Sequence, residues 1–127
     1  MNVTLLWGSL LALLYVVLSL EVVRHRRRAG VGIGHGQDKA LRRSIRVHAN
    51  FGEYVPFCVI LLGLLEADGA PALVLHGFGA TLLLSRVLHR VGLGAKPGTS
   101  IGRFWGAAGT IALLALAAGW GVFRALA

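Results

Sequence analysis

Four apolar runs, each about as long as a membrane is thick, constrain this sequence more than any other feature. They cover residues 3–23, 46–65, 72–93 and 101–123. A helix rises about 1.5 Å per residue and the hydrocarbon core of a bilayer is about 30 Å thick, so roughly 20 apolar residues span it. The chain of 127 residues is 56% hydrophobic and 14% charged, which is too little polar material to cover a water-soluble domain. We therefore predict an all-α protein with a single domain, a transmembrane four-helix bundle.

The first run has a second possible interpretation, a cleavable signal peptide. No basic segment precedes the run, no small-residue cleavage site follows it, and its length fits a membrane span better than a signal sequence. We therefore expect it to be retained as the first helix.

The basic residues are distributed very unevenly over the predicted topology. With four spans, the basic, glycine-rich loop 24–45 lies on the same side as the link between the third and fourth runs. These regions and their helix ends hold twelve of the thirteen Lys and Arg residues, and only Arg124 lies on the other side. The positive-inside rule then predicts cytoplasmic loops and two termini on the non-cytoplasmic side. Attraction to anionic lipid accounts for the net charge of +8, so no nucleic-acid partner is expected.

Several features that often mark binding sites have simpler explanations here. The glycines of residues 29–36 alternate strictly, miss the G-x-G-x-x-G spacing and follow a helix instead of a strand, which indicates a flexible or tightly turning loop. Cys58 is the only cysteine, so we expect a small buried residue and neither a disulfide within the chain nor a cysteine metal cluster. No metal site is predicted, because metal-ligand spacing is missing from the scattered residues His25, His35 and His76.

Close packing between helices is predicted at two places. The linker from Glu66 to Pro71 is short and contains Gly and Pro, so the second and third helices should form a tight antiparallel hairpin. The fourth run also carries small residues at four-residue spacing, a pattern that favours close helix contact. They are Gly102, Gly106, Ala117 and Gly121.

Polar residues inside the second run are the best candidates for a functional site. Arg46, Asn50 and Glu53 recur at i, i+4 and i+7, so they share one helix face and extend about 10 Å into the membrane. An ionised side chain near the bilayer centre costs about 2.5 to 3.5 kcal/mol, so we expect these groups to face the bundle interior. In an antiparallel hairpin, residues at equal distance from the turn lie at the same depth in the membrane. Glu53 should therefore lie at the depth of Arg86, and Asn50 at the depth of His89.

These positions together predict a polar pocket that opens to the cytoplasm between the second and third helices, beneath the arginines of the first loop. The alternative is a buried ion-pair network that only fixes helix packing. Such a network accounts for Glu53 with one arginine but leaves a surplus of cationic and hydrogen-bonding groups, which suits an anionic, polar ligand. The surplus comprises Arg46, Asn50, His89, Arg90 and Arg103.

The second run resembles a known family at these residues. Arg46-Val-His-Ala-Asn50-Phe-Gly-Glu53-Tyr54-Val-Pro56 is similar to the signature of the MAPEG family, the membrane-associated proteins in eicosanoid and glutathione metabolism. In that family the second helix carries R-x-x-x-N-x-x-E followed closely by Tyr and Pro, and Arg86-Val-Leu-His89 agrees with the third helix. The first loop resembles that of the small bacterial branch of uncertain function, which implies a multi-pass protein of the cell inner membrane.

The resemblance implies a homotrimer that binds glutathione between neighbouring subunits near the cytoplasmic face. Arg46, Asn50 and Glu53 would bind the tripeptide, with Glu53 suited to its ammonium group and Arg46 to a carboxylate. Further positions that match the same site are Tyr54, Arg86, His89 and one arginine of the first loop, Arg27 or Arg28.

Arg103, at the start of the fourth run, resembles the arginine that holds and activates the thiol. A thiol is mostly protonated at neutral pH, and a nearby guanidinium favours the nucleophilic thiolate. The implied reaction is conjugation of glutathione to a lipophilic electrophile from the bilayer, or reduction of a peroxide. Leu93 departs from the family, because a tyrosine stands there in several eicosanoid-converting members, and this argues against their specific chemistry.

Three functions remain from the sequence. The first, a membrane glutathione transferase or peroxidase, is favoured. The same residues would also suit another low-molecular-weight thiol in place of glutathione. The second is a non-catalytic family member that binds a thiol or lipid as a scaffold or carrier. A small transporter or channel subunit is disfavoured, because the polar residues gather at one end and do not cross the membrane.

Overall fold

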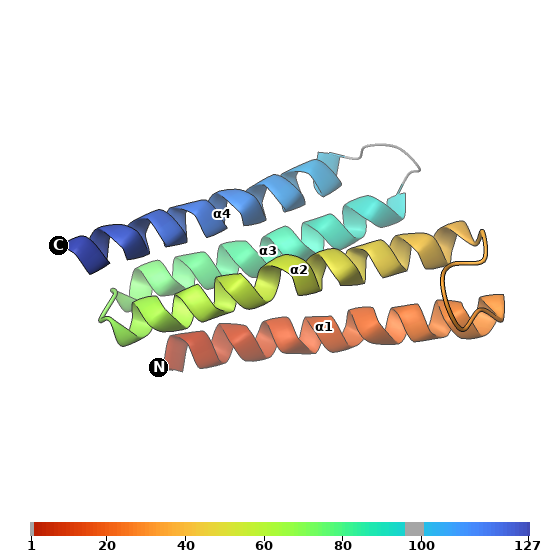
Figure 1. Ribbon diagram of the computed structural model, residues 1–127, viewed down its shortest axis with the longest axis horizontal. Helices are drawn as coiled ribbons and strands as arrows, with labels where there is room; N and C mark the ends of the chain where they lie inside the picture. Colours follow the sequence, from red (N-terminus) through yellow and green to blue (C-terminus); the bar gives the residue numbers. More distant parts are fainter. Residues whose placement is uncertain (1, 96–100) are drawn as a thin grey trace.

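The computed structural model describes residues 2–95 and 101–127, apart from the side chains of residues 93–95 and 103. Helices account for most of these residues: α1 (Asn2–Ala29), α2 (Lys39–Ala67), α3 (Ala72–Ala95) and α4 (Ile101–Leu126). Each contains a segment long and apolar enough to cross a membrane. Successive helices run in opposite directions, so both termini lie at the same end as the α2–α3 turn (Figure 1). The predicted all-α bundle with four candidate membrane spans is confirmed.

α2 and α3 form the centre of the bundle. Each of them contacts the other three helices, whereas α1 and α4 do not touch each other over the described residues. One cluster of buried side chains, around Phe51 and Leu82, joins α2 and α3 to both outer helices. A second, around Leu62 and Leu75, belongs to the end that carries the α2–α3 turn. Large apolar side chains such as that of Phe57 are exposed on the outside, where lipid would cover them.

Two helices extend well beyond the apolar runs. α1 continues to Ala29 and α2 begins at Lys39, so the predicted loop 24–45 is wrong in extent and shrinks to residues 30–38. Asp38 caps α2, since its Oδ1 accepts a hydrogen bond from the backbone N–H of Leu41 at 2.7 Å. An apolar run marks only the part of a helix that lies in hydrocarbon. Arginine has a high helix propensity, so the arginine-rich ends continue as helix outside it.

The α1–α2 loop folds back on the end of α1. Gly30, Gly34 and Gly36 have φ angles of 64°, 72° and 50°, in the left-handed region that favours glycine. Arg26 donates hydrogen bonds from Nη1 to the carbonyl oxygens of Gly32 and Gly34, each at 3.0 Å. Of the two alternatives, a flexible or a tightly turning loop, the structure therefore has the second, held by an arginine.

Two polar contacts close the end of the bundle that carries the termini. The Glu66 carboxylate accepts hydrogen bonds from the backbone N–H groups of Val3 and Thr4 at 3.0 and 2.9 Å. These groups lie at the N-terminus of α1, where the helix dipole favours a negative charge. Arg124 of α4 forms an ion pair with Asp68 in the α2–α3 turn. The acidic residues of this end therefore attach the outer helices to the central hairpin.

α4 packs closely on α3 at two of the predicted small residues. A Cβ atom on Gly106 would lie 2.6 Å from the backbone nitrogen of His89 and 2.6 Å from the carbonyl oxygen of Ser85. A Cβ atom on Gly102 would also meet the α3 backbone, at 3.2 Å. Gly121 has no such neighbour within 4 Å, so the packing prediction is wrong for that position within one chain.

Candidate functional site

The polar face of α2 lies at the boundary between the interior and the exterior of the bundle. Asn50 is half-buried, whereas Arg46 and Glu53 are exposed. The prediction that all three face the interior is therefore wrong for the single chain. The three positions cover about 60° of the helix circumference, so a small rotation of α2 decides which of them is buried.

Arg86 is buried at the junction of α2, α3 and α4, with only 3% of its surface exposed. Its Nη1 donates to Oδ1 of Asn50 at 2.9 Å, and its Nη2 donates to the carbonyl oxygen of Gly106 at 2.8 Å. Arg86 is therefore paired with Asn50 and not with Glu53, the residue expected at its level. Glu53 points out of the bundle, and Asn50, about one turn away on the inner side of α2, takes its place.

A small cavity of about 30 Å³ adjoins this junction and is lined by Asn50, Tyr54, Arg86 and Thr110, among others. The Nε atom of Arg86 is buried and has no hydrogen-bond partner among the described residues. Thr110 donates from Oγ1 to the carbonyl oxygen of Gly106 at 3.0 Å, so this oxygen accepts from both side chains. Arg86 therefore joins three helices, and Tyr54, a predicted site residue, lies beside it.

The remaining predicted site residues lie at the same end of the bundle but on different surfaces. His89 is buried on α3, where its backbone faces Gly106 of α4. Arg27 and Arg28 are exposed in the last turn of α1. Arg103 belongs to the first turn of α4, and its side chain lies outside the described residues, as does that of Leu93.

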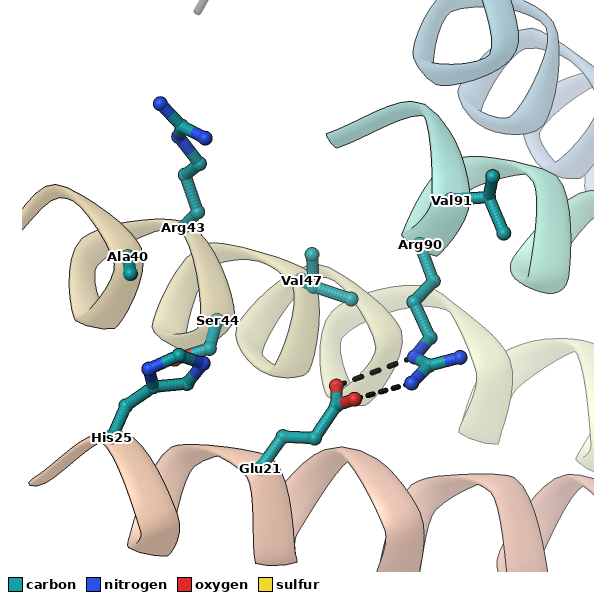
Figure 2. A pocket seen from close by; sticks show the side chains of 8 residues that line it. All are labelled: Glu21, His25, Ala40, Arg43, Ser44, Val47, Arg90 and Val91. Atoms are coloured by element: carbon teal, nitrogen blue, oxygen red, sulfur yellow. Dashed lines mark hydrogen bonds and ion pairs between the residues drawn. The ribbon is translucent and has the colours of Figure 1, made fainter. Parts of the chain in front are cut away.

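A larger polar cleft of about 380 Å³ lies between α1, α2 and α3 at the end that carries the α1–α2 loop. α1 contributes Glu21 and His25, and α3 contributes Arg90. The guanidinium of Arg90 forms a two-point ion pair with the Glu21 carboxylate, in which Nε donates to Oε2 at 3.2 Å (Figure 2). The α2 wall includes Arg43 and Ser44.

This cleft lies at the predicted end of the bundle, but it is not the polar pocket predicted around Arg46, Asn50 and Glu53. α1 forms a third wall, and Arg46, Asn50 and Glu53 are not among the lining residues. Glu21 was not predicted from the sequence as a site residue. The sequence did contain an indication, because Glu21 is the only acidic residue of the first apolar run and a carboxylate at such a position requires a cationic partner.

Beside the cleft, α1 and α2 are joined by an aromatic and polar contact. Oγ of Ser19 and Nε2 of His48 are 3.1 Å apart. The ring of Tyr15 stacks on the His48 ring with centroids 4.6 Å apart, and on the ring of Phe51 at 5.4 Å. His48, which lies within the stretch from Arg46 to Pro56, therefore has a packing role in the bundle.

An apolar groove lies elsewhere on the bundle, away from the polar cleft. A groove of about 470 Å³ between α3 and α4 is lined by apolar and small residues, including Phe78, Gly109 and Leu116. Cys58 is buried in the core, as predicted. Within residues 2–95 and 101–127, no three His, Cys, Asp or Glu side chains are grouped so that they would hold a metal ion.

Comparison with known proteins finds one matching family model and two similar proteins, both named YecN. The family model of the MAPEG family matches residues 4–123. The inner membrane protein YecN of Escherichia coli strain K12 is 37% identical over 90 residues, which cover 71% of this chain and 69% of YecN. YecN of Escherichia coli O6:H1 matches to the same extent. No solved structure matches the chain.

Proposed function

The chain belongs to the MAPEG family, and from this premise we propose that it is a membrane-bound, glutathione-dependent transferase or peroxidase that acts on lipophilic electrophiles. It is a multi-pass protein of the inner membrane, with four helices that are suited to span the bilayer. The proposal assigns the polar face of α2 to the thiol peptide and the surrounding lipid to the electrophile.

The exposed charges of Arg46 and Glu53 carry the proposal. Both belong to a membrane-spanning helix, and neither has a hydrogen-bond or ion-pair partner among the described residues. Charges in such a position require partners from outside the chain. The two residues are about 10 Å apart along α2, with the amide of Asn50 between them. A peptide with an ammonium group for Glu53 and a carboxylate for Arg46, such as glutathione, matches this arrangement.

The same face of α2 supports binding between subunits of a homotrimer. Arg46 and Glu53 point away from their own bundle, so a neighbouring chain would cover a ligand that lies on them. Further along the same stripe, Phe57, Ile60 and Leu64 are 64%, 59% and 61% exposed. This apolar continuation of the stripe suits a contact between subunits in the membrane.

The chemistry would take place at the basic end, which we place in the cytoplasm. The guanidinium of Arg103, at the start of α4, would favour the thiolate of the bound peptide. Tyr54 and an arginine from Arg27 or Arg28 would complete the peptide site, while Arg86 and His89 would support it from within the bundle. The apolar groove between α3 and α4 offers an electrophile a path from the lipid.

A non-catalytic member that binds a thiol or lipid as a scaffold or carrier is the alternative. The observation in its favour is Leu93, which replaces a tyrosine of several eicosanoid-converting members. Binding and turnover distinguish the two functions, because a carrier would bind the thiol and leave an electrophile unreacted.

The test is titration of the purified protein with glutathione by calorimetry, followed by an assay with an aromatic electrophile. Arg46→Ala and Glu53→Ala should each weaken glutathione binding by about tenfold or more, because each removes a charge-assisted contact. Arg42→Ala, which removes an exposed arginine of the same helix, should change the affinity little, and all three variants should keep the oligomer. No binding of millimolar glutathione to the wild type would contradict the proposal, and binding without turnover would favour the carrier.

A further inference from the structure

The polar cleft between α1, α2 and α3 opens on a different part of the α2 surface from the proposed thiol site. Arg46, Asn50 and Glu53 do not line the cleft, and Ser44, in its wall, lies about 180° around the helix from Glu53. Arg43, which also lines the cleft, lies only about 60° around the helix from Arg46, so the two sites are neighbours on α2. A ligand in the cleft would contact a different set of side chains from the proposed thiol peptide.

The charges of the cleft favour an anion. Glu21 and Arg90 neutralise each other in their ion pair. Arg43 and His25 have no hydrogen-bond or ion-pair partner among the described residues, so the lining keeps a surplus positive charge. The guanidinium of Arg43 extends from α2 away from the ion pair, while His25 lies opposite Ser44 (Figure 2). Guanidinium groups bind phosphate oxygens with two parallel hydrogen bonds.

The position of the cleft along the membrane normal favours a lipid as the source of that anion. Glu21 is the first charged residue of α1, and the helix from Asn2 to Glu21 is about 28 Å long, close to the thickness of the hydrocarbon core. The cleft therefore lies at the depth of lipid headgroups. Part of its wall is apolar, through Ala40, Val47 and Val91, and Val91 is 58% exposed beside it.

We propose that this cleft binds the phosphate group of an anionic phospholipid, with the guanidinium of Arg43 as the donor and the acyl chains directed along α1 and α3. His25 adds a polar side chain to the wall of the cleft beside Ser44 (Figure 2). Arg90 stays paired with Glu21 and holds the cleft open between these two helices. Basic pockets between membrane helices are a recurrent type of site for such headgroups. A zwitterionic phospholipid lacks the net negative charge that the surplus cation selects, so it should bind less well.

The experiment measures lipid retained by the full-length protein. The wild type is purified in detergent with an equal mixture of phosphatidylglycerol and phosphatidylcholine, and bound lipid is counted by native mass spectrometry. We expect enrichment of phosphatidylglycerol and its reduction by about fivefold in Arg43→Gln, since one basic residue contributes about that factor. Arg42→Gln is the matched control, because it removes a neighbouring exposed arginine that does not line the cleft. The control should change retention by less than about twofold.

A second variant separates the cleft from diffuse surface charge. Ala40→Leu leaves the charge unchanged and fills part of the cleft, so it should also reduce phosphatidylglycerol retention. Equal losses in Arg42→Gln and Arg43→Gln, or full retention in Ala40→Leu, would overturn the proposal. Millimolar glycerol phosphate serves as the soluble competitor. Displacement of the lipid by this compound alone would overturn the lipid source, whereas retention of the lipid in its presence supports it.

Discussion

The hydrogen bond between Arg86 and Asn50 fixes the orientation of the Asn50 amide, which lies between Arg46 and Glu53 on the polar face of α2. A guanidinium can only donate hydrogen bonds, so Asn50 must accept from Arg86 with its carbonyl oxygen, at 2.9 Å. The amide nitrogen of Asn50 then points away from Arg86 and keeps its two donors for another partner. In the proposed thiol site, Arg86 would therefore act as a positioning residue from the interior of the bundle, without contact with the ligand.

The substitution Asn50→Asp tests this role. Asp keeps an acceptor for Arg86 and converts the hydrogen bond to an ion pair, so the thermal unfolding temperature should stay the same or rise. It removes the amide donors, so glutathione affinity should fall by roughly tenfold. Calorimetry and thermal unfolding in detergent measure the two effects separately. Unchanged affinity in a folded Asn50→Asp protein would show that the amide donors do not contact the ligand.

Double-variant measurements of stability should also identify Asn50 as the partner of Arg86. Arg86→Met and Asn50→Leu remove two ends of one hydrogen bond, so their effects on the free energy of unfolding should not add. Arg86→Met and Glu53→Gln should add to within about 0.5 kcal/mol, because the Glu53 side chain points out of the bundle. Reversible unfolding of the single and double variants measures both couplings. Strong coupling to Glu53 would mean that α2 is rotated relative to the structure described here.

The backbones of α3 and α4 approach each other closely, and glycine makes this contact possible. The position of a Cβ atom on Gly106 lies 2.6 Å from two backbone atoms of α3, which cannot move as a flexible side chain would. The outer helix α1 is held differently, by polar contacts through Glu66 near its beginning and Glu21 near its end. Removal of a carboxylate would loosen α1 locally, whereas a larger residue at position 106 would separate two whole helices.

Alanine substitutions at two glycines of α4 should have opposite signs. Gly106→Ala should destabilise the protein by about 1 to 3 kcal/mol, because the added methyl group overpacks the contact with α3. Gly121→Ala meets no atom within 4 Å and should stabilise the helix by up to about 1 kcal/mol through its higher helix propensity. Thermal unfolding of both variants in the same detergent compares them directly. Equal destabilisation would mean that Gly121 is also packed, as in a contact between subunits.

For the whole molecule, the arrangement of charges divides the bundle into two ends. The end with both termini carries Glu66 and Asp68, together with Arg124, and the other end carries the arginine-rich end of α1 and the basic beginning of α2. The positive-inside rule therefore predicts that the basic end faces the cytoplasm, which would place the proposed thiol site and the proposed phosphate site both at the cytoplasmic end.

Reporter fusions test this topology. A reporter joined after Ala127 should be active outside the cytoplasm, and one joined after Lys96, which lies outside the described residues, should be active inside. Alkaline phosphatase and green fluorescent protein are suitable, because each is active on only one side. A cytoplasmic C-terminus would reverse the predicted orientation and move both proposed sites to the other face of the membrane.

The sequence by itself determined the number of helices, the hairpin turn and the set of polar residues along one stripe of α2. These properties are local, since apolar length is compared with membrane thickness and a stripe follows from the helical repeat. The resemblance at Arg46, Asn50 and Glu53 also identified the family, because a motif at fixed spacing is read without any fold.

Only the tertiary structure decided which member of the stripe is buried, which group accepts from Arg86, and that Glu21 meets Arg90 across 69 residues of chain. A helix can rotate about its axis, or slide by one turn, without any change in its apolar length or its periodicity. The rotation and register of α2 and α3 are set by the summed packing of all four helices. Contacts between residues far apart in the chain depend on that sum and cannot be obtained from any single segment.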